Sequence, residues 1–176
     1  MRQSCLDMRT GALVLAIASL AVAFAKAGWE DYKPGSLGAI VEAHRSEMVG
    51  PDTDLFSANN FPTRARVVYQ GSIRPIPSDR LRFLAEYLGK FRSHPEWVPH
   101  YADEILCREG EKGYWLPIQS EVLRFLKEEI PTGSAVDLFV TWLGAHRGDA
   151  GVDWIFTINE FDAVPKVDAD PPKSDR

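Results

Sequence analysis

Three side chains that can bind a metal ion fall within seven residues of the chain. They are His94, Glu96 and His100, and imidazole nitrogen and carboxylate oxygen are ligands that zinc takes from proteins. Two prolines in the same stretch prevent the helical geometry that would place both imidazoles on one face. With His146 as a remote further ligand, the set would suit a small metal-dependent hydrolase, which we keep as the alternative function.

A second group of side chains suits ligand binding rather than catalysis. Aromatic rings offer flat apolar surfaces and guanidinium groups bind anions, so the mixture suits sugars, peptides or anionic groups. The candidate ligand-binding residues are Arg80, Arg82, Trp97, Tyr101, Tyr114, Trp115 and Arg147. The alternative is that Trp97, Tyr114 and Trp115 only cover the hydrophobic core.

Nucleophilic catalysis finds little support in the sequence. Cys107 lies in a strand-like run in register with Ile105, so we expect its thiol to point inward and to behave as a small hydrophobic group. The chain contains no Gly-x-Ser-x-Gly nucleophile elbow. We therefore assign no catalytic residue and no cofactor, and the sequence favours a binding protein over an enzyme.

The elements that position these residues follow from hydrophobic periodicity and from turn signals. Apolar residues three and four apart predict helices, and alternation of apolar and polar residues predicts strands. In the first half of the chain we expect a helix capped by Ser36 that ends near Gly50, a loop to Pro62, a strand over 65–74 and a helix from Ser78 to Arg92. A loop over 94–100 and a hairpin of strands 103–108 and 114–119 should follow. The last expected elements are a helix over 120–130 capped by Ser120 and a hairpin of strands 136–142 and 154–161.

After the N-terminal helix, the order of elements is β-α-β-β-α-β-β. The five-stranded OB barrel has the same order, with a helix between its third and fourth strands. We therefore predict an α+β domain consisting of a small antiparallel five-stranded β-barrel with an extra N-terminal helix. The alternative is a single antiparallel sheet with helices on one face. In an OB barrel, ligands bind on the second and third strands and on the loops after the first and fourth strands.

The N-terminal segment has the order of a secretory signal peptide. Arg2 and Arg9 flank a short polar start, and an uncharged apolar run extends from Gly11 to Ala25. This run of 15 residues is shorter than the roughly 20 that a spanning helix needs, and small residues permit cleavage after Ala25 or Ala27. We expect export to the periplasm or beyond, with membrane contact only through this segment if it is not cleaved.

These observations divide the chain into four parts, each with a distinct composition. They are a signal peptide over 1–27, an N-terminal helix and loop over 28–62, the OB-like barrel domain over 63–162, and a polar tail over 163–176 that we expect to be disordered.

Charge and cysteine content limit the partners of the mature domain. The formal net charge is −5, and it becomes −7 without the signal peptide, which disfavours nucleic-acid binding. Of the two cysteines, Cys5 leaves with the signal peptide, so that no internal disulfide can form. The partner that we predict is an unknown envelope protein or glycan.

Overall fold

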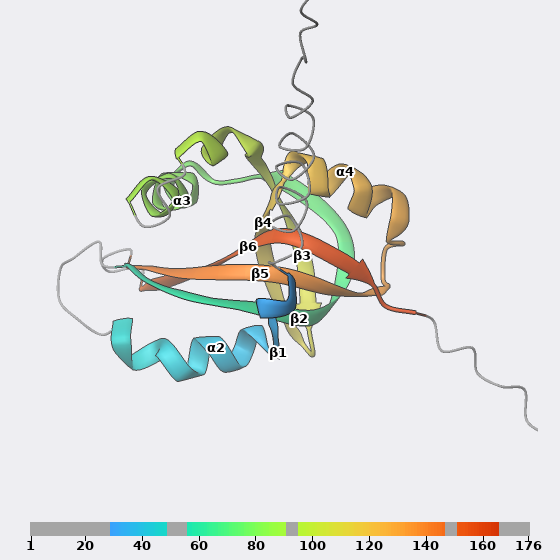
Figure 1. Cartoon of the computed structure of the whole chain (residues 1–176), viewed down its shortest axis with the longest axis horizontal. Coiled ribbons are helices and arrows are strands. Elements are labelled where there is room, and N and C mark those ends of the chain that lie inside the picture. The colour runs from blue at the N-terminus through green and yellow to red at the C-terminus, as the bar shows by residue number, and fades with distance from the viewer. Residues whose placement is uncertain (1–28, 49–55, 91–94, 147–150, 166–176) are drawn as a thin grey trace, which may run out of the picture. The chain divides into compact units, whose positions relative to one another are not determined.

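The computed structural model of the chain describes residues 29–48, 56–90, 95–146 and 151–165 (Figure 1). The predicted signal peptide, and the tail from residue 166, lie outside these residues. The chain divides into two compact units, 1–31 and 32–176. In the first unit the described part is a turn of 3-10 helix, η1 (Trp29–Asp31), and the elements below belong to the second unit.

The described part of the second unit is a six-stranded mixed sheet with three α-helices (Figure 1). The strands are β1 (Lys33–Gly35), β2 (Phe56–Pro75), β3 (Tyr101–Glu109), β4 (Lys112–Gln119), β5 (Ala135–His146) and β6 (Val152–Ala163). The helices are α2 (Leu37–His44), α3 (Ser78–Lys90) and α4 (Ser120–Glu129), with 3-10 helices η2 (Arg45–Met48) and η3 (Pro95–His100). The strand order is β1-β2-β3-β4-β6-β5, and β2 also pairs with β5, so the strands form a ring.

The predicted α+β class is confirmed, but the predicted strand count and strand directions are wrong in part. A sixth strand, β1, pairs with β2, and its three residues are too few for a recognisable alternation. The pairings β1–β2 and β4–β6 are parallel, so the sheet is mixed rather than antiparallel. The alternative of one antiparallel sheet is wrong for the same reason, and because β2 pairs with β5 and closes the ring.

The strand β2 changes partner along its 20 residues. Its residues 56–68 pair with β5, and residues 68–75 pair with β3. The register with β3 shifts between Tyr69 and Ile73, where Gly71 has a φ of +76° that glycine adopts without strain. This irregularity lets one strand pair with both β5 and β3, and these two pairings are needed to close the ring.

The expected loop before Pro62 is wrong, because β2 already begins at Phe56. The sequence 56–62 lacks the alternation of a half-buried strand, and its strand conformation comes from backbone pairing with β5. Pairing with a neighbouring backbone does not require apolar side chains, so hydrophobic periodicity does not detect it.

Two clusters of buried side chains lie on opposite faces of the sheet. The first takes residues from α2, α4 and strands β2 to β6, and the second takes residues from α3, β5 and β6 together with Ile76 and Tyr101. In β5, Val140 and Trp142 belong to the first cluster, whereas Leu143 and Ala145 belong to the second. Helix α3 therefore packs on the sheet face opposite to the one covered by α2 and α4, which also contradicts helices on a single face.

The helix starts agree with the sequence at one position and differ at another. Ser36 caps α2, since its hydroxyl accepts a hydrogen bond from the backbone N–H of Ala39 at 3.2 Å. Ser120 is instead the first residue of α4, and its hydroxyl donates to the carbonyl of His100 at 3.0 Å. The proline-rich stretch that we expected as a loop forms the short 3-10 helix η3.

Candidate functional site

A cavity of about 500 Å³ lies between the N-terminal halves of β4 and β6. These two strands run parallel, and their register pairs Ile118 with Ile158, beyond the cavity. The walls are residues 112–115 of β4 and 152–154 of β6, together with the end of β2, the start of α3 and Val41 of α2. The cavity is therefore placed where the two parallel strands of the ring separate.

The turn between β2 and α3 brings two arginines to the same wall. Pro75 ends β2, and α3 starts at Ser78, so Arg74 and Arg80 lie on either side of a short connection. The backbone N–H of Ile76 donates to the carbonyl of Ala102 at 3.0 Å, which holds this connection against β3. Both guanidinium groups consequently reach one acidic side chain of β3.

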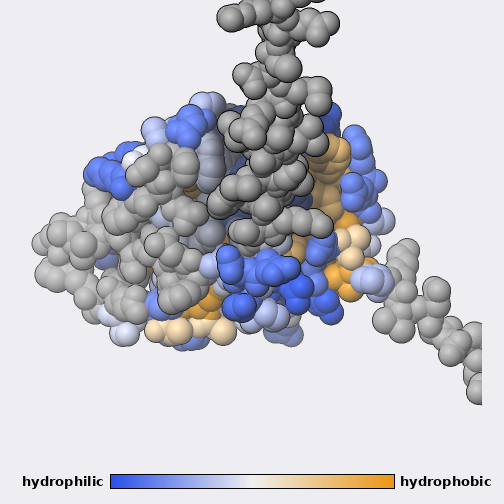
Figure 2. All heavy atoms as spheres, viewed as in Figure 1, coloured by the Kyte–Doolittle hydropathy of each residue, from blue (hydrophilic) through white to orange (hydrophobic). Residues whose placement is uncertain are grey.

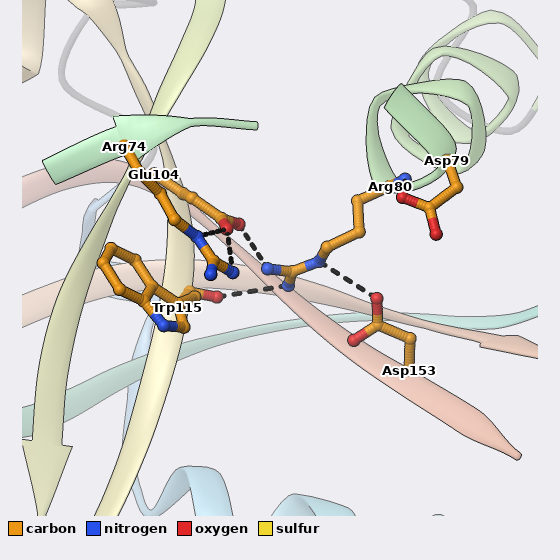
Figure 3. A network of polar contacts seen from close by, with 6 residues as sticks. All are labelled: Arg74, Asp79, Arg80, Glu104, Trp115 and Asp153. Atoms are coloured by element: carbon orange, nitrogen blue, oxygen red, sulfur yellow. Dashed lines mark hydrogen bonds and ion pairs between the residues drawn. The ribbon is translucent and has the colours of Figure 1, made fainter. Parts of the chain in front are cut away.

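That acidic side chain is Glu104, which is completely buried. Arg74 Nε donates to Glu104 Oε1 at 2.6 Å, and Arg80 Nη1 donates to Glu104 Oε2 (Figure 3). Each carboxylate oxygen thus has a charged donor, which is the condition under which a buried charge is tolerated.

Arg80 also connects the two separated strands (Figure 3). Its Nη2 donates to the backbone carbonyl of Trp115 in β4 at 3.1 Å, and its Nε lies 3.0 Å from Asp153 Oδ2 in β6. The contact with Asp153 is an ion pair by distance, without the alignment of a hydrogen bond. One buried guanidinium therefore fixes the spacing of β4 and β6 beside the cavity.

Aromatic rings form much of the remaining wall. The guanidinium of Arg74 lies 4.0 Å from the centre of the Trp115 ring, a cation–π contact. On the opposite strand, Trp154 packs against Trp142 with ring centres 5.6 Å apart. Lys112 Nζ lies 5.1 Å from the ring centre of Tyr114. The cavity thus combines flat apolar surfaces from two strands with cationic groups.

Three of the seven residues that the sequence suggested as ligand-binding line this cavity, namely Arg80, Tyr114 and Trp115. Tyr114 is also part of the first buried cluster, so for this ring the two interpretations, wall of a site and cover of the core, both hold. Trp115 is half-buried and lies outside both clusters.

Three of the other suggested residues are not among the described residues of the cavity wall. Arg82 lies over the ring of Phe83 at 4.8 Å, and Trp97 is an exposed residue of η3. Tyr101 is buried, its hydroxyl accepts from Gln119 Nε2 at 3.2 Å, and burial raises its pKa. Arg147 lies outside the described residues.

The described part of the chain brings no three of the suggested metal ligands together. His94 lies outside it, and the described residues, which include Glu96, His100 and His146, contain no group of three or more metal-binding side chains. The metal-dependent hydrolase therefore stays a prediction of the sequence.

Cys107 lies fully buried in the first cluster, as the strand register predicted. Burial raises the pKa of its thiol to about 12, because the thiolate would have to form without water around it. A thiol with so high a pKa is a poor nucleophile at neutral pH.

Among the residues of this site that the sequence missed are Arg74, Glu104, Lys112, Asp153 and Trp154. Arg74 carried a usable signal, since it precedes Pro75 at the end of a strand and is close in sequence to Arg80. Glu104 carried no such signal, because alternation with the buried Ile105 places Glu104 on the outer face of the sheet. That face is covered only because α3 packs there.

A second cavity of about 550 Å³ lies where the end of α4 meets the start of β5 and the end of β6. Its wall is mainly apolar, with Ile130, Pro131 and Val164 among its residues. Figure 2 shows hydrophobic colour gathered over this end of the molecule, where α4 and the end of β6 lie in Figure 1. Because Glu129 is the charged residue among its described walls, this cavity has few groups that could orient a polar ligand.

Comparison with known proteins gives no family. No protein-family model matches the chain, and a search of curated proteins finds no relative. The functional argument therefore depends on the geometry of the cavity between β4 and β6.

Proposed function

We propose that this protein is an exported, non-enzymatic binding module that holds its ligand in the cavity between β4 and β6. The single observation that carries this proposal is the arrangement of Arg74 and Arg80. Both are oriented by the buried Glu104, and Arg74 is stacked on the ring of Trp115 at the cavity wall. Side chains fixed in this way before binding lose little conformational entropy when a ligand arrives.

The finer fold assignment is part of the same proposal. The ring order β2-β3-β4-β6-β5 corresponds to the order 1-2-3-5-4 of an OB barrel, with α4 between the third and fourth strands. Counted in this way, the cavity is lined by the third strand, by the connection after the first, and by residues 152–154, with which the fifth strand begins after the fourth connection. These are regions where OB barrels bind ligands, which supports a binding role.

Export is the remaining part of the proposal, and it rests on the N-terminal segment of the sequence. Within the described ranges, no helix is long and apolar enough to cross a membrane. Mass spectrometry of the protein recovered from a secreting host tests this point. We expect a mature N-terminus at Lys26 or Gly28, whereas an intact N-terminus in the recovered protein would contradict cleavage.

Ligand binding is tested by NMR with an isotope-labelled mature protein and a mixed panel of small molecules. The panel contains uncharged and acidic oligosaccharides, short peptides, nucleotides and inorganic phosphate. We expect at least one class to shift the amide signals of residues 112–115 and 152–154, and Trp115→Ala to weaken that shift.

Trp97→Ala is the matched control for this measurement, because Trp97 is an exposed indole that does not line the cavity. It is expected to leave binding unchanged. A panel in which no class shifts the cavity signals would contradict the proposed function, as would turnover of a bound compound by the purified protein.

A further inference from the structure

The charged groups around the cavity largely compensate one another. Arg74 and Arg80 share Glu104, and Arg80 lies also within ion-pair distance of Asp153. Formal charges at the cavity cancel, three positive from Arg74, Arg80 and Lys112 against three negative from Asp79, Asp153 and Glu104. An anionic ligand would have to compete with internal carboxylates for these guanidinium groups, so the site does not favour a charged ligand.

Aromatic residues line the cavity on both separated strands. Tyr114 and Trp115 come from β4, and Trp154 comes from β6. The face of an aromatic ring carries partial negative charge, so it attracts the polarised C–H groups on the flat face of a sugar ring. Tyr114 and Trp154 pack with the first buried cluster, whereas Trp115 lies outside both clusters and is the ring that can offer such a surface to a ligand.

Polar groups with fixed orientation lie near Trp115 at the cavity wall. The side chain of Arg74 is 43% exposed, and that of Asp153 is 20% exposed. Arg74 binds Glu104 Oε1 through Nε and Nη2, so its Nη1 group is the one that can donate to a ligand hydroxyl group, and the carboxylate of Asp153 can accept from a neighbouring hydroxyl group. The cavity volume of about 500 Å³ is within the range of ligand-binding pockets.

We infer that the cavity between β4 and β6 binds a short segment of an uncharged pyranose oligosaccharide. This inference rests on the proposed function and names the ligand class of the same site. A sugar ring stacks on Trp115, and hydroxyl groups of the bound segment bond to Arg74 and Asp153.

The test is titration of the purified mature protein by calorimetry and by tryptophan fluorescence. The uncharged probes are cellotetraose, maltotetraose and chitotetraose, and the acidic probe is tetragalacturonate. We expect at least one uncharged probe to bind more tightly than tetragalacturonate, and Trp115→Ala to weaken that binding by about tenfold or more, the scale for losing an aromatic anchor.

Two further variants distinguish the loss of a ring contact from a general loss of folded structure. Trp115→Phe keeps a flat ring and is expected to retain part of the affinity, while Trp97→Ala is expected to retain all of it. Unchanged unfolding temperatures in the three variants show that the losses come from the site.

Preferential binding of tetragalacturonate would overturn the inference, because it would show that the cavity selects an anion. Failure of all four saccharides, combined with peptide or nucleotide shifts at 112–115 in the mixed panel, would overturn the sugar class and leave the binding function standing. Failure of every probe in both experiments would overturn both.

Discussion

Arg80 and Glu104 form an ion pair in which both partners are withdrawn from water, with side chains 7% and 0% exposed. Glu104 belongs to β3 and Arg80 to the first turn of α3, so the pair joins the helix to the outer face of the ring. The carboxylate binds a second guanidinium, that of Arg74, through its other oxygen. One acidic side chain thus positions both arginines of the candidate site.

Glu104→Gln should destabilise the protein by about 3–5 kcal/mol, because the variant leaves the buried guanidinium of Arg80 without its carboxylate partner on β3. The free energy of unfolding from urea denaturation measures this loss. Glu128→Gln on the exposed face of α4 is the control and should change stability little. Equal stability of the two variants would show that the pair adds nothing to folding.

The elements of this site were more predictable from the sequence than its contacts. Arg80 could be named because it follows two prolines at a helix start, but its partners Glu104 and Asp153 are distant in sequence. Alternation places Glu104 on the outer face of β3, and no local pattern tells that α3 will cover that face. Long-range packing decided the burial of the carboxylate, and with it the character of the site.

Backbone conformation restricts which residues are tolerated at position 71 more strictly than at position 89. At Gly71 the φ is +76°, and a Cβ would lie 2.4 Å from Thr132 Oγ1. Gly71→Ala should therefore cost about 1–3 kcal/mol of unfolding free energy. Gly89 lies in α3, and a Cβ there would meet no atom within 4 Å, so Gly89→Ala should stabilise by about 0.5–1 kcal/mol.

The two glycine variants should shift the unfolding temperature in opposite directions, Gly71→Ala downward and Gly89→Ala upward. A stabilising Gly71→Ala would mean that the register shift in β2 does not require a left-handed residue. Because the two substitutions are chemically identical, the comparison removes any general effect of adding a methyl group.

Glu109 at the end of β3 closes the N-terminus of α2. Its carboxylate accepts hydrogen bonds from the Ser36 hydroxyl and from the backbone N–H groups of Leu37 and Gly38, each at 2.9 Å. Glu109→Gln removes a negative charge at a helix N-terminus and should cost about 1–2 kcal/mol. Glu111→Gln, two residues along in the exposed turn, is the control.

Loss of α2 contacts should accompany the Glu109→Gln effect. Hydrogen exchange of the Val41 amide reports on this, because Leu37 and Val41 bury α2 against the first cluster. Faster exchange at Val41 with unchanged exchange in β5 is the expected pattern. Uniform acceleration across the sheet would mean that Glu109 supports the whole fold rather than the helix.

The buried thiol of Cys107 makes stability fall at high pH. Its pKa rises from 9.0 to about 12 on folding, so the folded state holds a proton that the unfolded state releases. The contribution of the thiol is therefore fully present below about pH 9 and declines through pH 12, by about 1.4 kcal/mol per pH unit. Tyrosines with raised pKa values add to the decline, so the measurement compares wild type with Cys107→Ala between pH 8 and 10.5. The stability difference between the two proteins should shrink as the pH rises, and a constant difference would show that the thiol ionises as easily in the folded state as in the unfolded chain.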